Sequence, residues 1–356
     1  MFEKLISGWD GERVVVRYDE PSGAWMFICM HSTRLGPAGG GTRMKVYESP
    51  AEGLADAMRL STAMTSKLAV AGLPFGGGKA VLAVREIPHG DERRELLVRY
   101  GDTVASLRGG FVTAPDVNTT ESDMDVVAER APGFVFCRSV ATGGSGSSAP
   151  ATALGVFHGM RATAQRVLGR DVDGLTVLVQ GVGGVGGELV ELLARAGAAV
   201  VVADIDADRA HEAAATVGGS VVSADRATET ECDIYAPCAL GGTLNERTIP
   251  GLRCRVVAGA ANNQLATQQD ADRLAARGII YAPDFVINAG GALHGAGVEL
   301  LGWDDERLAQ ELAQIGDTLL EVYDRAERDG TSTDAAAQQL AEERLSAPSG
   351  TGTRER

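Results

Sequence analysis

The chain has 356 residues, of which 44% are hydrophobic and 23% charged, a composition typical of a globular protein with room for two domains and two cores. Its formal net charge of -15 at pH 7 repels phosphate backbones, which argues against a nucleic-acid partner. No apolar run approaches about 18 residues, so no membrane partner or membrane span is expected.

The cysteines and histidines exclude further classes of protein. Five cysteines, an odd number without any C-x-x-C pair, favour reduced and mostly buried thiols. Residues 1–11 lack the apolar segment of a signal peptide, so we expect a cytoplasmic protein. The five histidines show no metal-ligand spacing, so no metal site is expected.

The first part of the chain predicts an α/β domain. Residues 13–19 and 24–30 are typical of two strands joined by a Pro-Ser-Gly turn. A terminal hairpin presents an edge that suits a seam between copies of the chain, so we expect a homo-oligomer. Further elements follow: a strand at 42–47 after the glycines at 39–41, a helix opened by Ser49 and Pro50 and closed at Gly72, a strand at 80–84, a helix at 91–107 and a strand at 111–114.

Two lysines, Lys67 and Lys79, flank a stretch that is otherwise apolar or glycine. Lys67 falls in the last turns of a helix, and Lys79 begins a strand after a glycine loop at 76–78, so one cleft can hold both ammonium groups. Apolar surroundings and a second cation both disfavour the charged form, so such a lysine can act as a base near neutral pH. The alternative is two surface lysines that lie beside a flexible turn.

Asp116 directly follows the strand at 111–114, where functional groups of α/β domains gather. An Asp before a helix is more often an N-cap. Because Asn118, Thr119 and Thr120 can cap the helix expected at 121–130, Asp116 is open to either role.

The second half predicts a dinucleotide-binding fold. A Gly- and Ser-rich segment at 142–148 suggests a boundary between domains at 1–148 and 149–356, with the last helices open to packing back on the first domain. A strand at 175–180 runs into the G-x-G-x-x-G segment at 181–186 and then into a helix at 188–196. The glycines admit a pyrophosphate to the helix N-terminus. Further strands are expected at 199–203, 220–223, 234–236, 256–258 and 279–281, which together predict a doubly wound sheet.

Asp204 ends the strand that follows the glycine segment, at the spacing of an acid that hydrogen-bonds a ribose 2′-hydroxyl. A carboxylate there opposes a 2′-phosphate, which favours NAD over NADP, although Arg209 lies nearby in the sequence. Two asparagine-containing clusters, around Asn262 and Asn288, follow later strands. They are open to binding a cofactor or a substrate amine, or to serving as turn residues. Helices are expected at 306–325 and 333–345, and a frayed end at 346–356.

Several of these segments together resemble the amino-acid dehydrogenase family, which holds the glutamate, leucine, valine and phenylalanine dehydrogenases. The resemblance spans nearly the whole chain and rests on GGGTR at 39–43, Lys67, GLPFGGGK at 72–79, the turn at 114–116, the glycine segment, AGAANNQL at 258–265 and PDFVINAGG at 283–291. It implies an N-terminal α/β substrate domain with a mixed sheet, a C-terminal Rossmann NAD domain, and catalysis in the cleft between them. It implies reversible oxidative deamination of an L-amino acid to the 2-oxo acid, ammonium and NADH.

The resemblance also implies roles for single residues. Lys67 matches the lysine that binds the substrate carboxylate, Lys79 the one that activates water and stabilises the carbinolamine, and Asp116 the proton-shuttling carboxylate. Gly40 and Asn262 are expected to hold the water and the substrate amine, and Thr152 the nicotinamide amide. The remaining cofactor contacts are expected at Gly181, Gly183, Val185, Gly186, Asp204, Ala239, Ala260, Asn262 and Asn288.

The pocket for the substrate side chain is expected to include Gly39, Met64, Ala114, Ala292, Leu293 and Gly295. None is charged, which argues against glutamate. Leucine-specific relatives resemble this pattern but tend to carry leucine in the place of Gly39 and valines in the places of Ala292 and Gly295. Each methylene contact is worth about 1 kcal/mol, so the smaller residues favour a bulkier substrate, and phenylalanine is the predicted one.

Two alternatives remain open. One is the same chemistry on leucine or valine, because the segment after Gly291 departs from the family's usual pattern and leaves His294 without a role. The other is an NAD-binding sensor without turnover, against which Lys79, Asp116 and the glycine segment are all intact.

Overall fold

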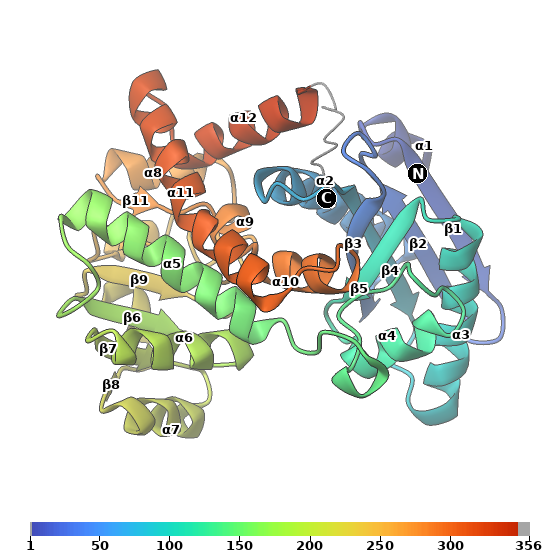
Figure 1. Cartoon of the computed structure of the whole chain (residues 1–356), viewed down its shortest axis with the longest axis horizontal. Coiled ribbons are helices and arrows are strands. Elements are labelled where there is room, and N and C mark those ends of the chain that lie inside the picture. The colour runs from blue at the N-terminus through green and yellow to red at the C-terminus, as the bar shows by residue number, and fades with distance from the viewer. Residues whose placement is uncertain (1, 348–356) are drawn as a thin grey trace. The chain divides into compact units, whose positions relative to one another are not determined.

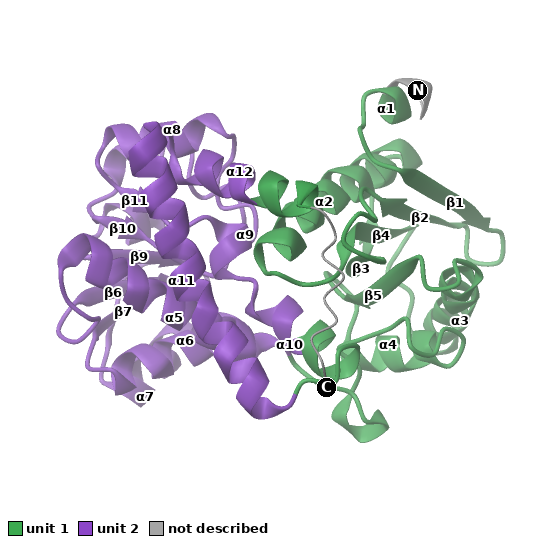
Figure 2. Cartoon of the chain, turned by 45° about the horizontal axis from the view of Figure 1, so that its top comes forward, with its two compact units in different colours: residues 1–147, 295–303, 341–356 green, residues 148–294, 304–340 purple. Residues whose placement is uncertain are grey.

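The structure is a computed structural model that describes residues 2–347 (Figure 1). The described chain divides into two compact units (Figure 2). Unit 1 comprises residues up to 147 with 295–303 and those from 341 onward, and unit 2 comprises residues 148–294 and 304–340. The frayed end expected at 346–356 lies largely outside the described residues.

Unit 1 contains a mixed sheet of five strands in the order β1-β2-β4-β3-β5. The first two pairings, β1 with β2 and β2 with β4, are antiparallel, whereas β3 runs parallel to both β4 and β5. The strands are β1 (Arg13–Asp19), β2 (Ala24–Met30), β3 (Ala38–Val46), β4 (Gly76–Val84) and β5 (Phe111–Pro115). The mixed sheet predicted for the N-terminal domain is therefore confirmed.

Helices cover both faces of this sheet. On one face α2 (Pro50–Val70) buries Leu54 and Met58 against strand side chains such as Phe27. On the other face α3 (Gly90–Ser106) and α4 (Glu121–Ala128) pack over a second cluster that includes Met44. Local signals define the helix starts, because the Ser49 side chain caps α2 ahead of Pro50 and a Thr120–Asp123 capping box opens α4. A short helix, α1 (Phe2–Ser7), precedes the sheet and was not predicted.

The prediction that the second glycine triplet forms a loop is wrong. Gly76, Gly77 and Gly78 are the first residues of β4, and β3 likewise begins at Ala38 rather than Thr42. A Cβ at Gly76 would lie 1.9 Å from the Ser32 carbonyl oxygen, and one at Gly77 would lie 2.0 Å from the Thr65 hydroxyl. These glycines therefore let the strand pack directly against neighbouring backbone, a need that looks like loop composition in the sequence.

Unit 2 contains six parallel strands in the order β11-β10-β9-β6-β7-β8, the predicted doubly wound sheet. The strands are β6 (Thr176–Gln180), β7 (Ala199–Ala203), β8 (Ser220–Val221), β9 (Ile234–Pro237), β10 (Val256–Val257) and β11 (Ile280–Tyr281). Their helices and 3-10 turns are α5 (Ala149–Leu168), α6 (Gly184–Arg195), α7 (Ala207–Val217), η2 (Ala224–Glu229), η3 (Ile249–Gly251), α8 (Gln269–Ala276) and α9 (Asp284–Ile287).

Three later helices complete the described part of the chain: α10 (Gly290–Glu299), α11 (Asp305–Asp329) and α12 (Thr333–Ser346). Within unit 2, α11 lies beside α5 (Figure 1), and the buried hydroxyls of Thr163 and Tyr323 hydrogen-bond between these two helices at 2.8 Å. In unit 1, a 3-10 turn, η1 (Val140–Thr142), lies shortly before the chain enters α5.

Two further findings concern the cysteines and the membrane span considered in the sequence. All five cysteines are free thiols, and four of them, all except Cys238, are buried. Among residues 2–347, no helix combines the length and the apolar character needed to cross a membrane.

Candidate active site

Lys79 and Asp116 form an ion pair in unit 1, with 2.7 Å between Nζ and Oδ2. Lys79 lies in β4, Asp116 follows β5 directly, and β3 runs between these two strands. Gly41 of β3 lies at their meeting point, where a Cβ would come 3.0 Å from the Asp116 Cβ and 3.4 Å from the Lys79 Nζ. The last glycine of the first triplet therefore allows the pair to form across β3.

Two further side chains fix this pair from the same face of the sheet. Arg43 follows Gly41 by two residues, so both lie on one face of β3. Its Nε donates to Asp116 Oδ2 at 3.1 Å, and its Nη1 donates to Asp56 Oδ2 of α2 at 2.9 Å. Neither residue was predicted as part of the site. Arg43 could have been found from its spacing to Gly41, whereas nothing in the α2 sequence distinguishes Asp56 from other polar residues of a surface helix.

The turn that carries Asp116 is tied to β3. Thr119 Oγ1 accepts from the Asp116 backbone N–H at 2.8 Å and donates to the Thr42 carbonyl at 2.7 Å. Asn118, at φ +58°, donates to the Met44 carbonyl at 3.1 Å. Thr120 caps α4, so Asp116 is not the helix cap. The Asp116 carboxylate thus stands on a rigid turn and faces Lys79 and Arg43.

Burial and charge shift the proton affinities of the pair. Burial lowers the pKa of the Lys79 ammonium, and Arg43 lowers it further, against the opposing effect of Asp116. Burial raises the pKa of the Asp116 carboxyl, but Lys79 and Arg43 outweigh it and hold that pKa below its usual value. Lys79 is only 6% exposed. The geometry therefore provides a carboxylate that is ionised at rest beside an amine that loses its proton more readily than an ordinary lysine.

The other residues predicted for substrate binding in unit 1 are distributed over the same elements. Lys67 lies in the last turn of α2, which also carries the half-buried Met64. Gly40 packs against Gly78, because a Cβ at Gly40 would lie 1.8 Å from the Gly78 carbonyl oxygen. The Gly40 carbonyl accepts a hydrogen bond from the Thr113 hydroxyl. Ala114 is buried in β5. A Cβ at Gly39 would lie 3.3 Å from Leu68 and 3.5 Å from Val112, so these side chains already border that position.

Gly295 is closely packed in the direction that a side chain would take. A Cβ at this position would lie 2.2 Å from Cys137 Sγ and 2.8 Å from the Phe136 ring. Cys137 adopts φ +53°, and its buried thiol packs against α10 at this glycine. The prediction that Gly295 enlarges the substrate pocket therefore loses its physical basis. On the same helix, Leu293 is buried and Ala292 is half-buried.

The glycine segment of unit 2 has the local geometry of a pyrophosphate cradle. Gly181 turns the chain at φ +96°, and Ala239 packs against it. A Cβ at Gly186 would lie 1.9 Å from the Gly181 carbonyl oxygen. Beside Gly183, by contrast, no atom of the described chain lies within 4 Å of a Cβ position. α6 begins at Gly184, and Val185 lies in its first turn. A tight turn, an open glycine and a close-packed one are the three features that this fingerprint requires.

Asp204 lies beside that segment. Its carboxylate accepts from the Val182 backbone N–H at 2.8 Å and from the Asp206 backbone N–H at 2.9 Å. Burial raises the pKa of Asp204, but these two backbone donors lower it below its usual value. An ionised acid is thus fixed at the start of the cradle, as ribose binding needs.

The two asparagine clusters meet each other in unit 2. Asn288 Nδ2 donates to Asn262 Oδ1 at 2.8 Å and to the Ala260 carbonyl at 3.0 Å. Thr152 lies in the first turn of α5, donates to the Ser148 carbonyl at 2.8 Å, and borders Gly291. The structure therefore brings Asn262, Asn288 and Ala260 together, while Thr152 lies in a separate contact with the start of α10.

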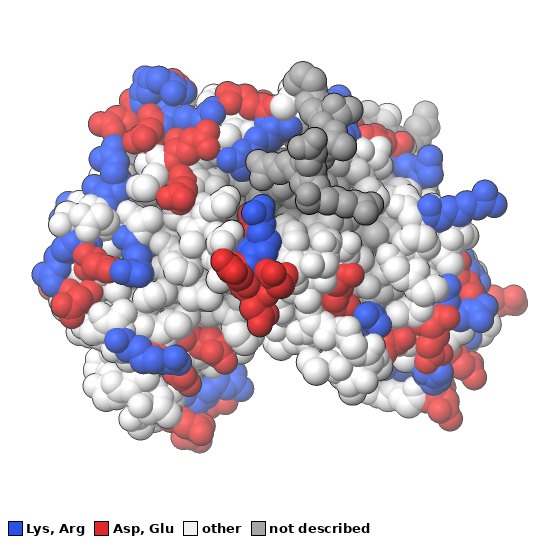
Figure 3. Space-filling view, in the orientation of Figure 1, with Lys and Arg blue, Asp and Glu red and all other residues white. Residues whose placement is uncertain are grey.

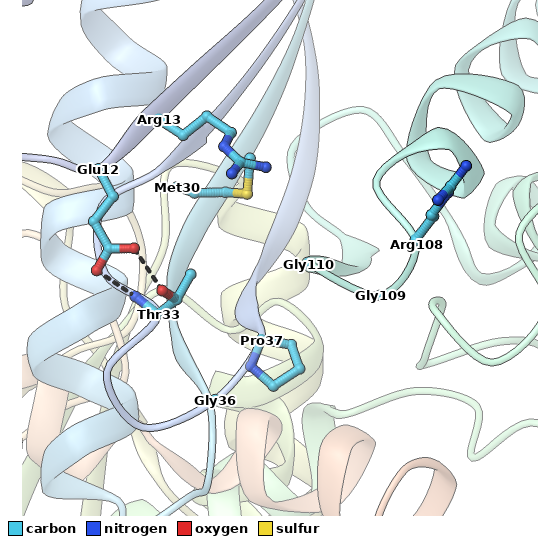
Figure 4. A pocket seen from close by; sticks show the side chains of 9 residues that line it. All are labelled: Glu12, Arg13, Met30, Thr33, Gly36, Pro37, Arg108, Gly109 and Gly110. Carbon is cyan, nitrogen blue, oxygen red and sulfur yellow. Dashed lines mark hydrogen bonds between the residues drawn. The ribbon is translucent and has the colours of Figure 1, made fainter.

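A pocket of about 400 Å³ in unit 1 involves none of these residues (Figure 4). It is bordered by Glu12, Arg13 and Met30, by the chain before β3 and by the α3–β5 turn. Glu12 accepts two hydrogen bonds from Thr33, at 2.8 and 2.5 Å. The pocket therefore contributes nothing to the chemistry of the Lys79–Asp116 pair.

On the face drawn in Figure 3, basic and acidic side chains are interspersed.

Comparisons with known proteins give consistent results. The profile described as "Glu/Leu/Phe/Val dehydrogenase, dimerisation domain" matches residues 16–132, and "Glutamate/Leucine/Phenylalanine/Valine dehydrogenase" matches residues 143–210 and 203–349. The leucine dehydrogenase of Thermoactinomyces intermedius is 44% identical over 95% of this chain and 91% of its own. The valine dehydrogenase of Streptomyces albus is 47% identical over 94% of this chain and 92% of its own. The crystal structure of L-tryptophan dehydrogenase from Nostoc punctiforme superposes with a TM-score of 0.83 at 38% identity and covers 97% of this chain and 98% of its own.

Proposed function

Since the chain belongs to the glutamate/leucine/phenylalanine/valine dehydrogenase family, whose members deaminate L-amino acids oxidatively with NAD(P), we propose that it acts on leucine or valine and uses NAD. The products are the 2-oxo acid, ammonium and the reduced cofactor. The observation that carries the proposal is the ion pair of the buried Lys79 with Asp116. Imine hydrolysis needs a base and a carboxylate that can exchange protons, and the lowered pKa of the buried Lys79 beside the ionised Asp116 supports these roles.

The roles proposed for single residues are those that the resemblance to the family implies for the matching positions. Lys67, at the end of α2, pairs with the substrate carboxylate, and Lys79 activates the water that attacks the imine carbon. Asp116 carries protons to and from the amino group, while Gly40 and Asn262 hold the water and the amine. A bound nicotinamide cofactor would supply the acceptor for the hydride of the α carbon. Thr152 would hold its amide and Asp204 its adenosine ribose, and the carboxylate of Asp204 would oppose a 2′-phosphate.

The side chain of the substrate is argued from two observations. Leucine and valine dehydrogenases share 44% and 47% identity with this chain over nearly its whole length. The case for a bulkier substrate rested on space left by small residues, and Cys137 and Phe136 fill that space at Gly295. Phenylalanine, the sequence-based expectation, is the second candidate. Ala292 and Gly39 favour it, as does the fold shared with a tryptophan dehydrogenase.

The test is the initial rate of NADH formation at alkaline pH with L-leucine, L-valine, L-phenylalanine and L-glutamate, each with NAD and with NADP. We expect kcat/KM for leucine or valine to exceed that for phenylalanine by about tenfold or more, and NAD to be preferred. Phenylalanine in the lead would replace the aliphatic assignment with the second candidate. No turnover of any amino acid would contradict the catalytic proposal and favour a nucleotide sensor.

A further inference from the structure

Arg43 contacts the catalytic carboxylate and is itself held from behind. Its Nε reaches the same Asp116 oxygen, Oδ2, that pairs with Lys79, at 3.1 Å and 2.7 Å respectively. The side chains of Arg43 and Asp116 are 17% and 20% exposed. Each of the two cations thus approaches one carboxylate oxygen from a different strand, Arg43 from β3 and Lys79 from β4.

Asp56 anchors the other end of the guanidinium. Its Oδ2 accepts from Arg43 Nη1 at 2.9 Å and from the Tyr47 hydroxyl at 2.7 Å, and its Oδ1 accepts from Arg59 at 2.8 Å. Asp56 is 14% exposed, so this anchor is shielded from water. A planar guanidinium bonded at both edges has little rotational freedom left, which a lysine ammonium could not reproduce.

We propose that Arg43 is a positioning residue for the dehydrogenase reaction: anchored by Asp56, it fixes the Asp116 carboxylate in the orientation that meets Lys79. The inference rests on the proposed function, because only that function gives Asp116 and Lys79 a reaction to perform. Arg43 need not touch the substrate for this role. It acts through Asp116, and it also sets the charge that Lys79 experiences.

The charge effect has a definite sign. The charged and titratable groups around Lys79 are Asp116, Arg43 and Asp56, with Tyr47 and Arg59 bonded to Asp56. Arg43 lowers the pKa of Lys79 through its own positive charge, which acts against the effect of Asp116. Removal of Arg43 therefore raises the pKa of Lys79.

Kinetics of the full-length enzyme test the positioning role. In Arg43→Gln we expect kcat to fall roughly 100-fold, KM for the amino acid to change by less than about threefold, and the acidic limb of kcat/KM to move to higher pH by about one unit. Arg43→Lys keeps the positive charge but cannot bond Asp56 and Asp116 at once as the guanidinium does. The acidic limb of kcat/KM is therefore expected at its wild-type pH, while kcat recovers only in part. Arg94→Gln, an exposed arginine paired with Glu129, is the matched control and retains wild-type values.

A second readout does not depend on turnover. Trace acetylation with acetic anhydride, followed by mass spectrometry across pH, reports the neutral fraction of Lys79 in each protein. Arg43→Gln moves the pH midpoint of Lys79 labelling to higher pH by about one unit, while Arg94→Gln leaves the midpoint unchanged.

The outcomes separate the two claims. A wild-type protein without amino-acid turnover overturns the proposed function, and the labelling shift still tests the effect of Arg43 on Lys79. If Arg43→Gln keeps wild-type kcat and an unmoved labelling midpoint, Arg43 is not a positioning residue. A drop in kcat with no shift in either pH profile, together with a lowered Tm, means that its role is structural, which also overturns the proposal.

Discussion

At the scale of single residues, a substitution of Lys79 tests the proposed mechanism most directly. Lys79→Ala removes the buried amine that activates water, and we expect kcat to fall by roughly 1,000-fold. NADH affinity is expected to be retained, because the glycine cradle belongs to unit 2. Steady-state rates and a fluorescence titration with NADH measure the two quantities. Lys45→Ala, which removes an exposed lysine of β3, is the control. A variant at Lys79 with near-normal kcat would exclude this lysine from the reaction.

Asp204 makes a separate prediction about the cofactor. Asp204→Asn keeps the shape of the side chain and one acceptor oxygen for the amides of Val182 and Asp206, but it removes the negative charge. We expect the ratio of kcat/KM for NADP to that for NAD to rise by about tenfold, because the repulsion of a 2′-phosphate disappears. Asp206→Asn, at the N-cap of α7, leaves the ratio unchanged. An unaltered ratio in Asp204→Asn would separate cofactor choice from this carboxylate.

Lys79 and Asp116 could be singled out from the sequence, whereas the residues that support their ion pair could not. Lys79 lies within an apolar and glycine-rich segment and Asp116 at a strand end, and both features are local. The contact of Arg43 with Asp56 depends on how α2 packs over β3, which no local pattern encodes. Similarly, the small residue at Gly295 was interpreted as space for the substrate, whereas the Cys137 thiol packs against it. Prediction from sequence failed where distant segments fill the same volume.

At the scale of elements, helices with caps were predicted more closely than strands rich in glycine. Ser49, Pro50 and Gly72 bracketed α2, whereas β4 was expected four residues late because its glycines resemble a loop. The start of α6 was missed for the same reason, since Gly184 and Gly186 of the fingerprint already lie within the helix. Gly76 and Gly186 serve close packing against backbone oxygens, and a rule that treats every glycine as a breaker misplaces the starts of β4 and α6.

The N-terminal turn of α12 makes a prediction about stability. Asp334, its second residue, is 9% exposed, and burial together with Asp284 and Asp272 raises its pKa from 3.8 to about 6. The folded state therefore holds this proton more tightly than the unfolded state. The resulting stabilisation is complete below pH 3.8 and is lost as the pH rises through about 6.

Asp334→Asn removes the loss of stability that ionisation of Asp334 causes in the folded protein. A shift from 3.8 to about 6 is about two units, so above pH 7 the variant is expected to be more stable than wild type by up to about 3 kcal/mol, and by less at pH 5. Urea unfolding at pH 5, 6, 7 and 8 measures the difference. Asp305→Asn, at an exposed acid in the first turn of α11, provides a control with no pH-dependent gain. A constant difference between Asp334→Asn and wild type across this range would disprove the buried titration.

At the scale of the whole molecule, the assembly of the chain is the open prediction. The edge strand β1 exposes Val16 and Tyr18, each 46% accessible, and residues 16–132 match a profile described as a dimerisation domain. We expect light scattering to give a mass of several chains. Val16→Lys combined with Tyr18→Lys places charge on this edge and lowers the mass, whereas Val140→Lys, at another exposed valine of unit 1, does not. An unchanged mass in the double variant would place the seam elsewhere.

The five thiols also bear on how the molecule can be studied. Burial raises the pKa of Cys29, Cys137 and Cys232 to about 12 and that of Cys238 and Cys254 to about 11. A maleimide reacts with the thiolate, so at neutral pH the native chain offers such a reagent almost nothing. Cysteines introduced at the exposed Val140 of unit 1 and Leu240 of unit 2 would then be the two reactive sites. A pair of dyes attached there would report the separation of the two units in solution, with and without cofactor, and the wild-type cysteines could all remain in place.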